Sequence, residues 1–199
     1  MLSANGSPGT ETDPATSTPD ATLPAGAYVL QANLSIYVES LDPELPVVVS
    51  VHRVTEAWEE SRVTWGVDGV AFDNGDAADP NDNGAVASFE ITGPGLYTAD
   101  ISALVQAWSY EDFPNYGLLL RQEESGTTQY ISGDSDEPAS VRPTIEIYIG
   151  GELFTFRRDD ADDVLDLQDA YISQASPNEN GNDASLFTTY DAAAGGTLS

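Results

Sequence analysis

Alternation of apolar and polar residues is the feature that most limits how this chain folds. From residue 28 to residue 39 every second residue is apolar, namely Tyr28, Leu30, Ala32, Leu34, Ile36 and Val38, and Gln31, Asn33, Ser35 and Glu39 lie on the other side. Between 47 and 54, Val47, Val49 and Val51 fall on one side, with Ser50 and His52 opposite. A period of two predicts half-buried strands. We expect His52, the only histidine, to face solvent without a partner.

Other segments extend this β pattern and add one helix. Strands are predicted at about 117–122, 128–132 and 143–149, and two more flank the Gly-Pro-Gly turn at 93–95. Apolar residues at positions 101, 104, 105 and 108 have the i, i+3, i+4, i+7 spacing of a short helix. Asp100 or Ser102 is placed to cap that helix.

Composition restricts the classes of function. The 199 residues suit one domain with one core. The absence of cysteine excludes a disulfide framework, thiol catalysis and cysteine-ligated metals. The net charge of -28 disfavours nucleic acid and anionic membranes as partners. Such acidity fits divalent cations or a salty medium, so we expect a secreted or cell-surface protein. No membrane span is expected, because no apolar run approaches the roughly 20 residues that a span needs.

Three motifs resemble a known family. They are T-x-x-W-x-E-x-x-V-T-W at 55–65, D-I-S-x-L-V-Q-x-W at 100–108 and N-Y-G-L-L-L at 115–120. Together they resemble the DNRLRE family of extracellular β-sandwich domains, which also includes carbohydrate-binding modules. The resemblance implies an all-β fold, a jelly-roll-like antiparallel β-sandwich with one short helix. It also implies that Trp58 and Trp65 fill the core at one end of the sandwich; the alternative is that a tryptophan stacks on a sugar ring.

One family motif is displaced in this chain. Residues 169–187 are similar to the strand pair that opens ordinary family members, directly ahead of the L-P-x-G-A turn found here at 23–27. The resemblance therefore predicts a sandwich that its C-terminal segment completes. The predicted organisation is a flexible tail or linker (1–22), a β-sandwich core (23–150), an acidic connector with a candidate edge strand (151–168) and a strand segment (169–199).

A sandwich that lacks strands leaves unpaired edges, which natural proteins protect. The C-terminal segment is predicted either to fold back in cis or to insert into the next copy, and a third alternative is that it begins the next repeat of a tandem array. Insertion in trans is head-to-tail strand addition, which builds an open filament of identical subunits. The candidate subunit-interface residues are Tyr171, Ile172, Leu186 and Phe187.

Two functions follow from these alternatives. The first is a structural subunit of an extracellular or cell-surface filament, assembled by strand donation. The alternative is a secreted carbohydrate-binding module, with the terminal strands in cis and acidic loops or exposed tyrosines contacting an extracellular polysaccharide. Carboxylate pairs such as Glu59 and Glu60 are abundant, but the sequence has no nucleophile elbow, P-loop or metal-binding histidine cluster. We therefore expect a protein that is not an enzyme.

One loop has the spacing of a calcium site. Residues 79–90 fit D-x-[DN]-x-[DN]-G-x5-E, with Asp79, Asn81, Asn83 and Glu90 as candidate Ca²⁺ ligands. Asp73 and Asp76 are candidates to supplement them. No flanking helices are predicted, so the alternatives are a weak calcium loop of a β protein and a turn in an Asp- and Asn-rich stretch.

Two triplets fit the N-glycosylation pattern. They begin at Asn5 and Asn33. Asn33 is expected on the outward side of its strand.

Overall fold

The computed structural model describes residues 24–42, 46–59, 62–64, 71–75, 84–122, 126–133, 135–157 and 185–190. Within these ranges the chain forms strands, one α-helix and one short 3-10 helix, η1 (Ala139–Val141). The strands are β1 (Val29–Leu41), β2 (Val47–Arg53), β3 (Ala85–Ile91), β4 (Gly95–Asp100), β5 (Leu118–Gln122), β6 (Gly126–Ile131), β7 (Thr144–Ile149), β8 (Glu152–Arg157) and β9 (Ser185–Tyr190), and the helix is α1 (Ser102–Ser109).

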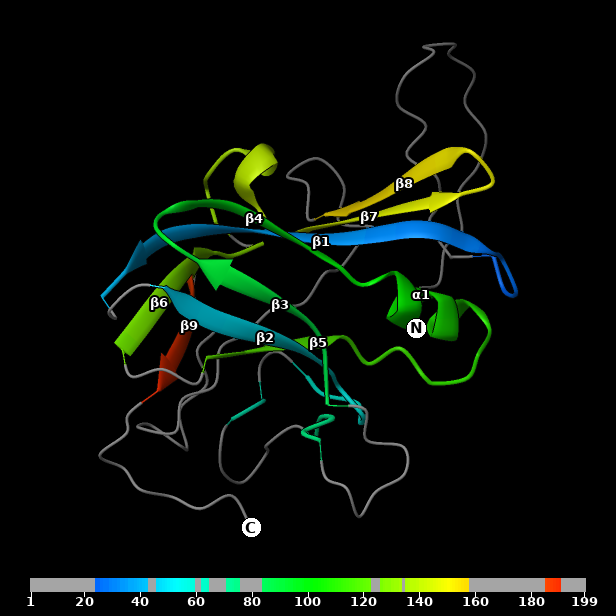
Figure 1. Ribbon diagram of the computed structural model, residues 1–199, viewed down its shortest axis with the longest axis horizontal. Helices are drawn as coiled ribbons and strands as arrows, with labels where there is room; N and C mark the ends of the chain where they lie inside the picture. Colours follow the sequence, from blue (N-terminus) through cyan, green and yellow to red (C-terminus); the bar gives the residue numbers. More distant parts are fainter. Residues whose placement is uncertain are drawn as a thin grey trace.

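The strands form two antiparallel sheets that pack as a sandwich, which confirms the predicted fold class (Figure 1). In the large sheet, β4 pairs with one side of β1. The other side of β1 pairs with β7 near its start and with β6 near its end. β8 then flanks β7, and β9 flanks β6. The small sheet has the order β3-β2-β5.

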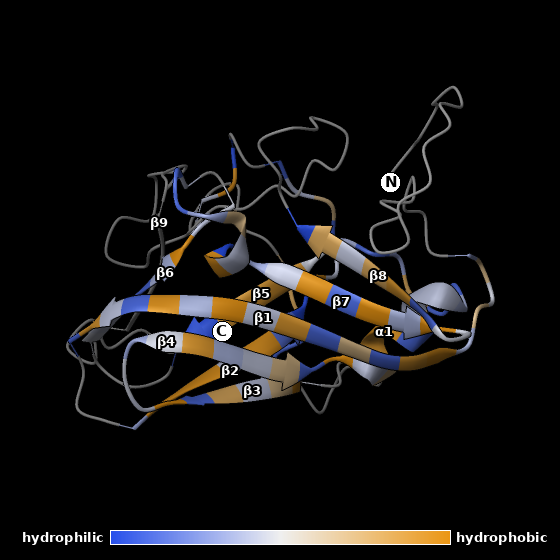
Figure 2. Cartoon of the chain, turned by 90° about the horizontal axis from the view of Figure 1, so that it is seen from above, coloured by the Kyte–Doolittle hydropathy of each residue, from blue (hydrophilic) through white to orange (hydrophobic). Residues whose placement is uncertain are grey.

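The core lies between the sheets and follows the predicted alternation. Val47, Val49 and Val51 on β2 are fully buried, and they face Ala32, Leu34, Ile36 and Val38 in one cluster. Figure 2 shows hydrophobic and hydrophilic residues alternating along β1 and β7. The prediction is wrong for Tyr28 and Leu30, which are 67% and 59% exposed. The β1–β7 register shifts between Val29 and Gln31, so Val29 is buried in their place.

A corner, rather than a hairpin, connects β3 to β4. β3 pairs with β2 in the small sheet, whereas β4 pairs with β1 in the large sheet. The Tyr97 hydroxyl fixes this corner: it accepts hydrogen bonds from the backbone N–H groups of Thr92 (3.0 Å) and Gly93 (3.1 Å) and donates to the Gly93 carbonyl (2.8 Å).

The helix begins and ends within one residue of its prediction, and its first turn is attached to β1. The Asp100 carboxylate accepts hydrogen bonds from the Ser102 hydroxyl and from the Ser102 backbone N–H. These two bonds, the side-chain one first, lower the pKa of Asp100 from its usual value near 3.8. The Ser102 hydroxyl also accepts from the Ala32 backbone N–H at 2.8 Å. Asp100 therefore satisfies the first N–H of the helix, whereas the N-cap position itself is Ile101, which has no side-chain capping bond.

The end of α1 contains a glutamate in a conformation that favours glycine. Glu111 has φ of 61°, and it is the only non-glycine residue with positive φ in the described part of the chain. The N–H of Asp112 bonds to the Ala107 carbonyl and that of Glu111 to the Trp108 carbonyl, which is the Schellman pattern.

Replacing Glu111 by glycine is expected to stabilise the fold. A side chain in the left-handed region costs roughly 1–2 kcal/mol, and glycine avoids that cost while losing some entropy in the unfolded chain. We expect a net gain of about 1 kcal/mol, measured as a shift of the urea midpoint. Glu111→Ala serves as the control and should give no such gain.

Candidate functional site

The edge of β6 is the place where the chain's C-terminal segment joins the sandwich. Gly126–Ile131 pairs residue by residue with β9, from Gly126 opposite Tyr190 to Ile131 opposite Ser185. Two predicted interface residues lie in this ladder: Leu186 is opposite Tyr130, and Phe187 is opposite Gln129. The other two, Tyr171 and Ile172, lie outside the described residues.

β6 is held firmly by the rest of the sandwich. Tyr130 and Thr128 are 1% and 0% exposed, and Tyr130 pairs with Val38 on β1. The Thr128 hydroxyl donates to Gln122 Oε1 at 2.7 Å, and the Gln122 amide donates to the Gly126 carbonyl at 3.2 Å. The strand that receives β9 is therefore anchored to both sheets, to β1 by pairing and to β5 by side chains.

The segment 71–75, hereafter the 71–75 loop, is fastened to the end of β2. Phe72 forms an isolated bridge with Val54, and the Asp73 N–H donates to the Arg53 carbonyl at 3.0 Å. Arg53 donates from Nε and Nη2 to the two carboxylate oxygens of Asp73 at 2.8 and 2.9 Å. Both side chains are almost fully buried, at 7% and 4% exposed. Arg53 also lies 4.0 Å from the centre of the Phe113 ring.

The expectation for His52 is wrong, because the 71–75 loop covers the outward side of β2 at this point. His52 is 5% exposed. Its Nδ1 lies 2.6 Å from the Asp73 carbonyl oxygen, which only accepts, so Nδ1 carries the proton and donates. Its Nε2 lies 2.8 Å from the Ser50 hydroxyl, and its ring meets Phe72 edge to face at 5.3 Å. His52 therefore holds the loop in place.

Sequence reasoning did not predict this buried cluster. The available signal was an arginine at the end of an apolar strand, in a chain with only six arginines and no lysine. A charged residue is almost never buried unless it is paired. Its partner lies 20 residues further along, in a stretch where acidic residues are too common for one to stand out.

Only part of the candidate calcium site lies in the described residues. Glu90 is exposed on β3, opposite Val48, whereas Asp76, Asp79, Asn81 and Asn83 lie outside. Asp73, the candidate to supplement the site, accepts hydrogen bonds from Arg53 on both carboxylate oxygens. In the part that the structure describes, no three His, Cys, Asp or Glu residues are grouped to hold a metal ion. Calcium binding stays a prediction.

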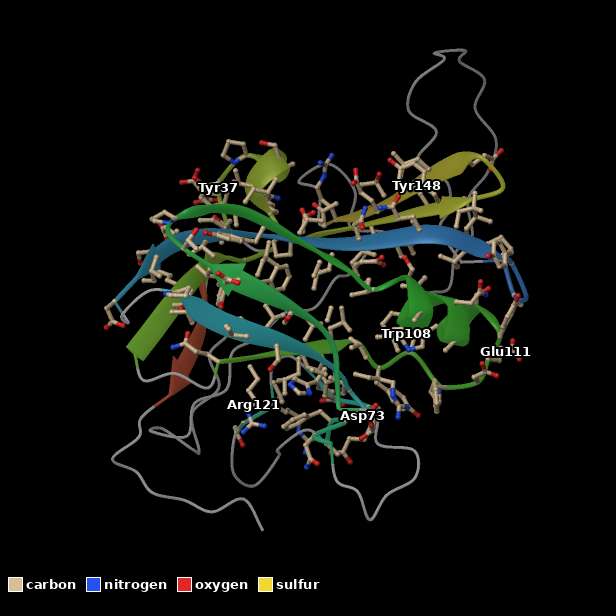
Figure 3. The ribbon with its side chains drawn as sticks, viewed as in Figure 1. Tyr37, Asp73, Trp108, Glu111, Arg121 and Tyr148 are labelled. Carbon is tan, nitrogen blue, oxygen red and sulfur yellow. The ribbon has the colours of Figure 1, made fainter. Side chains whose placement is uncertain are left out.

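The side of the large sheet that faces away from the core, hereafter the outer face, is a flat polar surface with two tyrosines. Cross-strand register places Leu153, Tyr148 and Gln31 in one row, and Tyr37 and Leu96 in another. Between them lie Asn33, Ser35 and Thr98, and the two hydroxyls of Ser35 and Thr98 are 3.0 Å apart. Figure 3 shows Tyr37 and Tyr148 on this face, on the opposite side of the sandwich from Asp73.

Asn33 faces outward as expected, and its glycosylation stays a prediction; Asn5 lies outside the described residues.

Two of the three tryptophans lie in the described residues. Trp58 is half-buried, and its indole N–H donates to the Tyr116 carbonyl at 2.8 Å. Trp108 packs against the core. Its Nε1 is the only buried side-chain polar atom without a hydrogen-bond partner within the described ranges. Trp65 lies outside those ranges, so its predicted place in the core stays untested.

Comparison with known proteins gives no relative: no family model, curated protein or solved structure matches the chain. The resemblance to the DNRLRE family therefore stays a prediction. Among the described residues, no helix has the length and apolar character to cross a membrane.

Proposed function

We propose that this protein is a structural subunit of an extracellular or cell-surface filament, in which the C-terminal strand of one copy completes the sandwich of the next. The observation that carries the proposal is the β6–β9 pairing. All other strands of the large sheet lie before residue 158 in the sequence. β9, which comes from the C-terminal region, pairs with β6 at one edge of that sheet.

Exchange of this strand between copies is inexpensive in free energy. A β9 from another copy makes the same backbone pairs with β6 as the chain's own β9, so the exchanged and unexchanged forms differ little in contacts. The pairing itself resembles β-strand addition, in which main-chain hydrogen bonds supply affinity.

The connection is long enough for a neighbour's edge. Ser185 follows Arg157 by 28 residues, which can span roughly 90 Å when extended. A compact domain of this length has a radius of gyration of roughly 16 Å. Each copy gives one strand and receives one, so the contact is head-to-tail and generates an open filament unless it closes into a ring.

The proposal is tested with an engineered disulfide, because the natural chain has no cysteine. Thr127 lies directly opposite Thr189, and directly opposite residues in an antiparallel pair are close enough to be bridged. The variant Thr127→Cys/Thr189→Cys is oxidised at high protein concentration and analysed under denaturing conditions. We expect a ladder of covalently linked multimers. A covalent monomer alone would overturn the proposal, because it would place β9 in cis.

The matched control moves one cysteine by a single position. Thr127→Cys/Thr188→Cys puts the second thiol on the opposite face of β9, so it should form neither the ladder nor an internal bridge. A ladder in this control would show random cross-linking.

A second candidate function, a carbohydrate-binding module, is favoured by the outer face. Tyr148 and Tyr37 lie there among amide, hydroxyl and carboxylate side chains, with exposed Leu96 and Leu153 at the margins. Aromatic rings beside polar groups suit the apolar faces and hydroxyls of a sugar.

Binding to a panel of extracellular polysaccharides, with and without calcium, tests this candidate. Tyr148→Ala should weaken binding, whereas Tyr110→Ala, which removes a half-exposed tyrosine near the end of α1, should leave it unchanged. Absence of binding to every glycan under both conditions would contradict it.

A further inference from the structure

The β7–β8 hairpin ends in a tight turn that determines which backbone groups point outward. Gly150 and Gly151 both have positive φ, at 60° and 93°, as a two-residue type I′ turn requires. Such a turn makes its flanking residues, Ile149 and Glu152, a hydrogen-bonded pair. Bonded and non-bonded pairs then alternate along the ladder. Leu153, Thr155 and Arg157 are therefore the residues of β8 whose N–H and C=O groups point away from β7.

Among the described residues, the centre of this outward edge has none of the sequence features that usually protect an edge strand. Within the described part of the chain, β8 pairs with β7 alone. Natural edge strands are usually blunted by lysine, proline, a bulge or an inward-pointing charge. The centre of β8, Leu-Phe-Thr-Phe at 153–156, contains none of these, and its pairing with β7 is regular throughout. Leu153 is 43% exposed.

We propose that β8 is a self-association edge, which pairs antiparallel with β8 of a second copy and joins the two large sheets into one. The two-fold axis passes beside Thr155. In this register Thr155 lies opposite Thr155 of the second copy, and Leu153 lies opposite Arg157. All three residues with outward backbone groups are then used in each copy, which gives the longest ladder that the edge allows.

Side chains and charges agree with this register. In an antiparallel pair, residues directly opposite each other lie on the same face. On the core side, Phe154 of each copy lies opposite Phe156 of the other; these side chains are half-buried and buried in the single copy. Glu152 and Arg157 lie at opposite ends of β8, so antiparallel pairing brings the negative end of one strand to the positive end of the other.

The net charge of the chain makes this association depend on salt. Two copies at -28 each repel one another at low ionic strength. At about 1 M salt the Debye length is only about 3 Å, and short-range pairing then dominates. If the chains also exchange β9, pairing through β8 joins neighbouring filaments side by side, because it uses a different edge.

An engineered cysteine tests the register directly. Thr155→Cys should form a disulfide-linked dimer under mild oxidation at about 1 M NaCl. Thr98→Cys is the control, since Thr98 is also a threonine of the outer face on an edge strand, β4. We expect at least several-fold faster cross-linking at position 155. Equal rates at the two positions would overturn the proposal. Exchange of β9 does not bring two copies of Thr155 together, so this result is independent of the filament test.

A pair of lysine variants tests the energetics of the same edge. Leu153→Lys places a lysine directly opposite Arg157 of the other copy, so two positive charges repel at each end of the β8–β8 ladder. Leu96→Lys makes the same substitution on β4. Both change the net charge equally, and both residues are exposed, at 43% and 58%. Both substitutions are made in the chain that keeps Thr155, and dimerisation is measured by sedimentation velocity at high salt. Leu153→Lys should weaken dimerisation roughly ten-fold or more, and Leu96→Lys should not. Equal association of the two variants, or a wild-type chain without association through β8, would overturn the proposal.

Discussion

Replacing Arg53 by leucine is expected to lower the free energy of unfolding by about 3–5 kcal/mol. The substitution leaves the Asp73 carboxylate buried, at 4% exposed, without the two guanidinium hydrogen bonds of 2.8 and 2.9 Å. It also removes the contact between the guanidinium and the Phe113 ring. The loss is large because a buried charge that loses its partner retains its full desolvation cost.

Three further variants identify the cause of that loss. Arg62→Leu breaks the exposed pair with Glu59, whose side chains are 64% and 67% exposed, and should change stability by about 0.5 kcal/mol or less. Arg53→Lys keeps the charge without the two-pronged geometry, so it should fall between wild type and Arg53→Leu. Arg53→Leu/Asp73→Leu removes both charges and should recover part of the loss. Urea denaturation of the wild-type chain and the four variants provides the values, and an Arg53→Leu loss as small as that of Arg62→Leu would show that the pair is not a stabilising link.

The 71–75 loop also explains why the sequence predicted the strands better than their surroundings. Alternation along β2 correctly assigned Val47, Val49 and Val51 to the core, because these three residues share the side of the strand that packs against the large sheet. The same alternation placed His52 on the other side, which is correct for the strand. It could not predict that residues 71–75 fold over that side, since the contact depends on tertiary structure 20 residues away.

Register and pairing were the other features that local pattern could not supply. One irregularity in the β1–β7 ladder reverses the burial of Leu30 and Val29, because successive strand residues point to opposite faces. The strands β3 and β4 were predicted with their turn, but their membership of different sheets depends on the corner that Tyr97 fixes. The C-terminal strand was anticipated only through the family resemblance. The sequence did not predict which strand pairs with it; in the structure that strand is β6.

Replacing Tyr130 by alanine is expected to lower the free energy of unfolding by about 3–5 kcal/mol. Tyr130 is the largest fully buried side chain in the described residues, and it lies in the main core cluster. Tyr148→Ala is the matched control: Tyr148 is half-exposed on the outer face, so its loss should cost about 1 kcal/mol. Tyr130→Phe keeps the packing and should also cost about 1 kcal/mol.

The same variant connects core packing to the terminal strand. Tyr130 lies opposite Leu186, one pair from the end of the β6–β9 ladder, so a cavity at Tyr130 weakens β6 where it holds β9. Hydrogen exchange should therefore show faster exchange at residues 185–190 in Tyr130→Ala than in Tyr148→Ala, under conditions where both proteins remain folded. If exchange at β9 is the same in both variants, the terminal strand does not depend on the packing of β6.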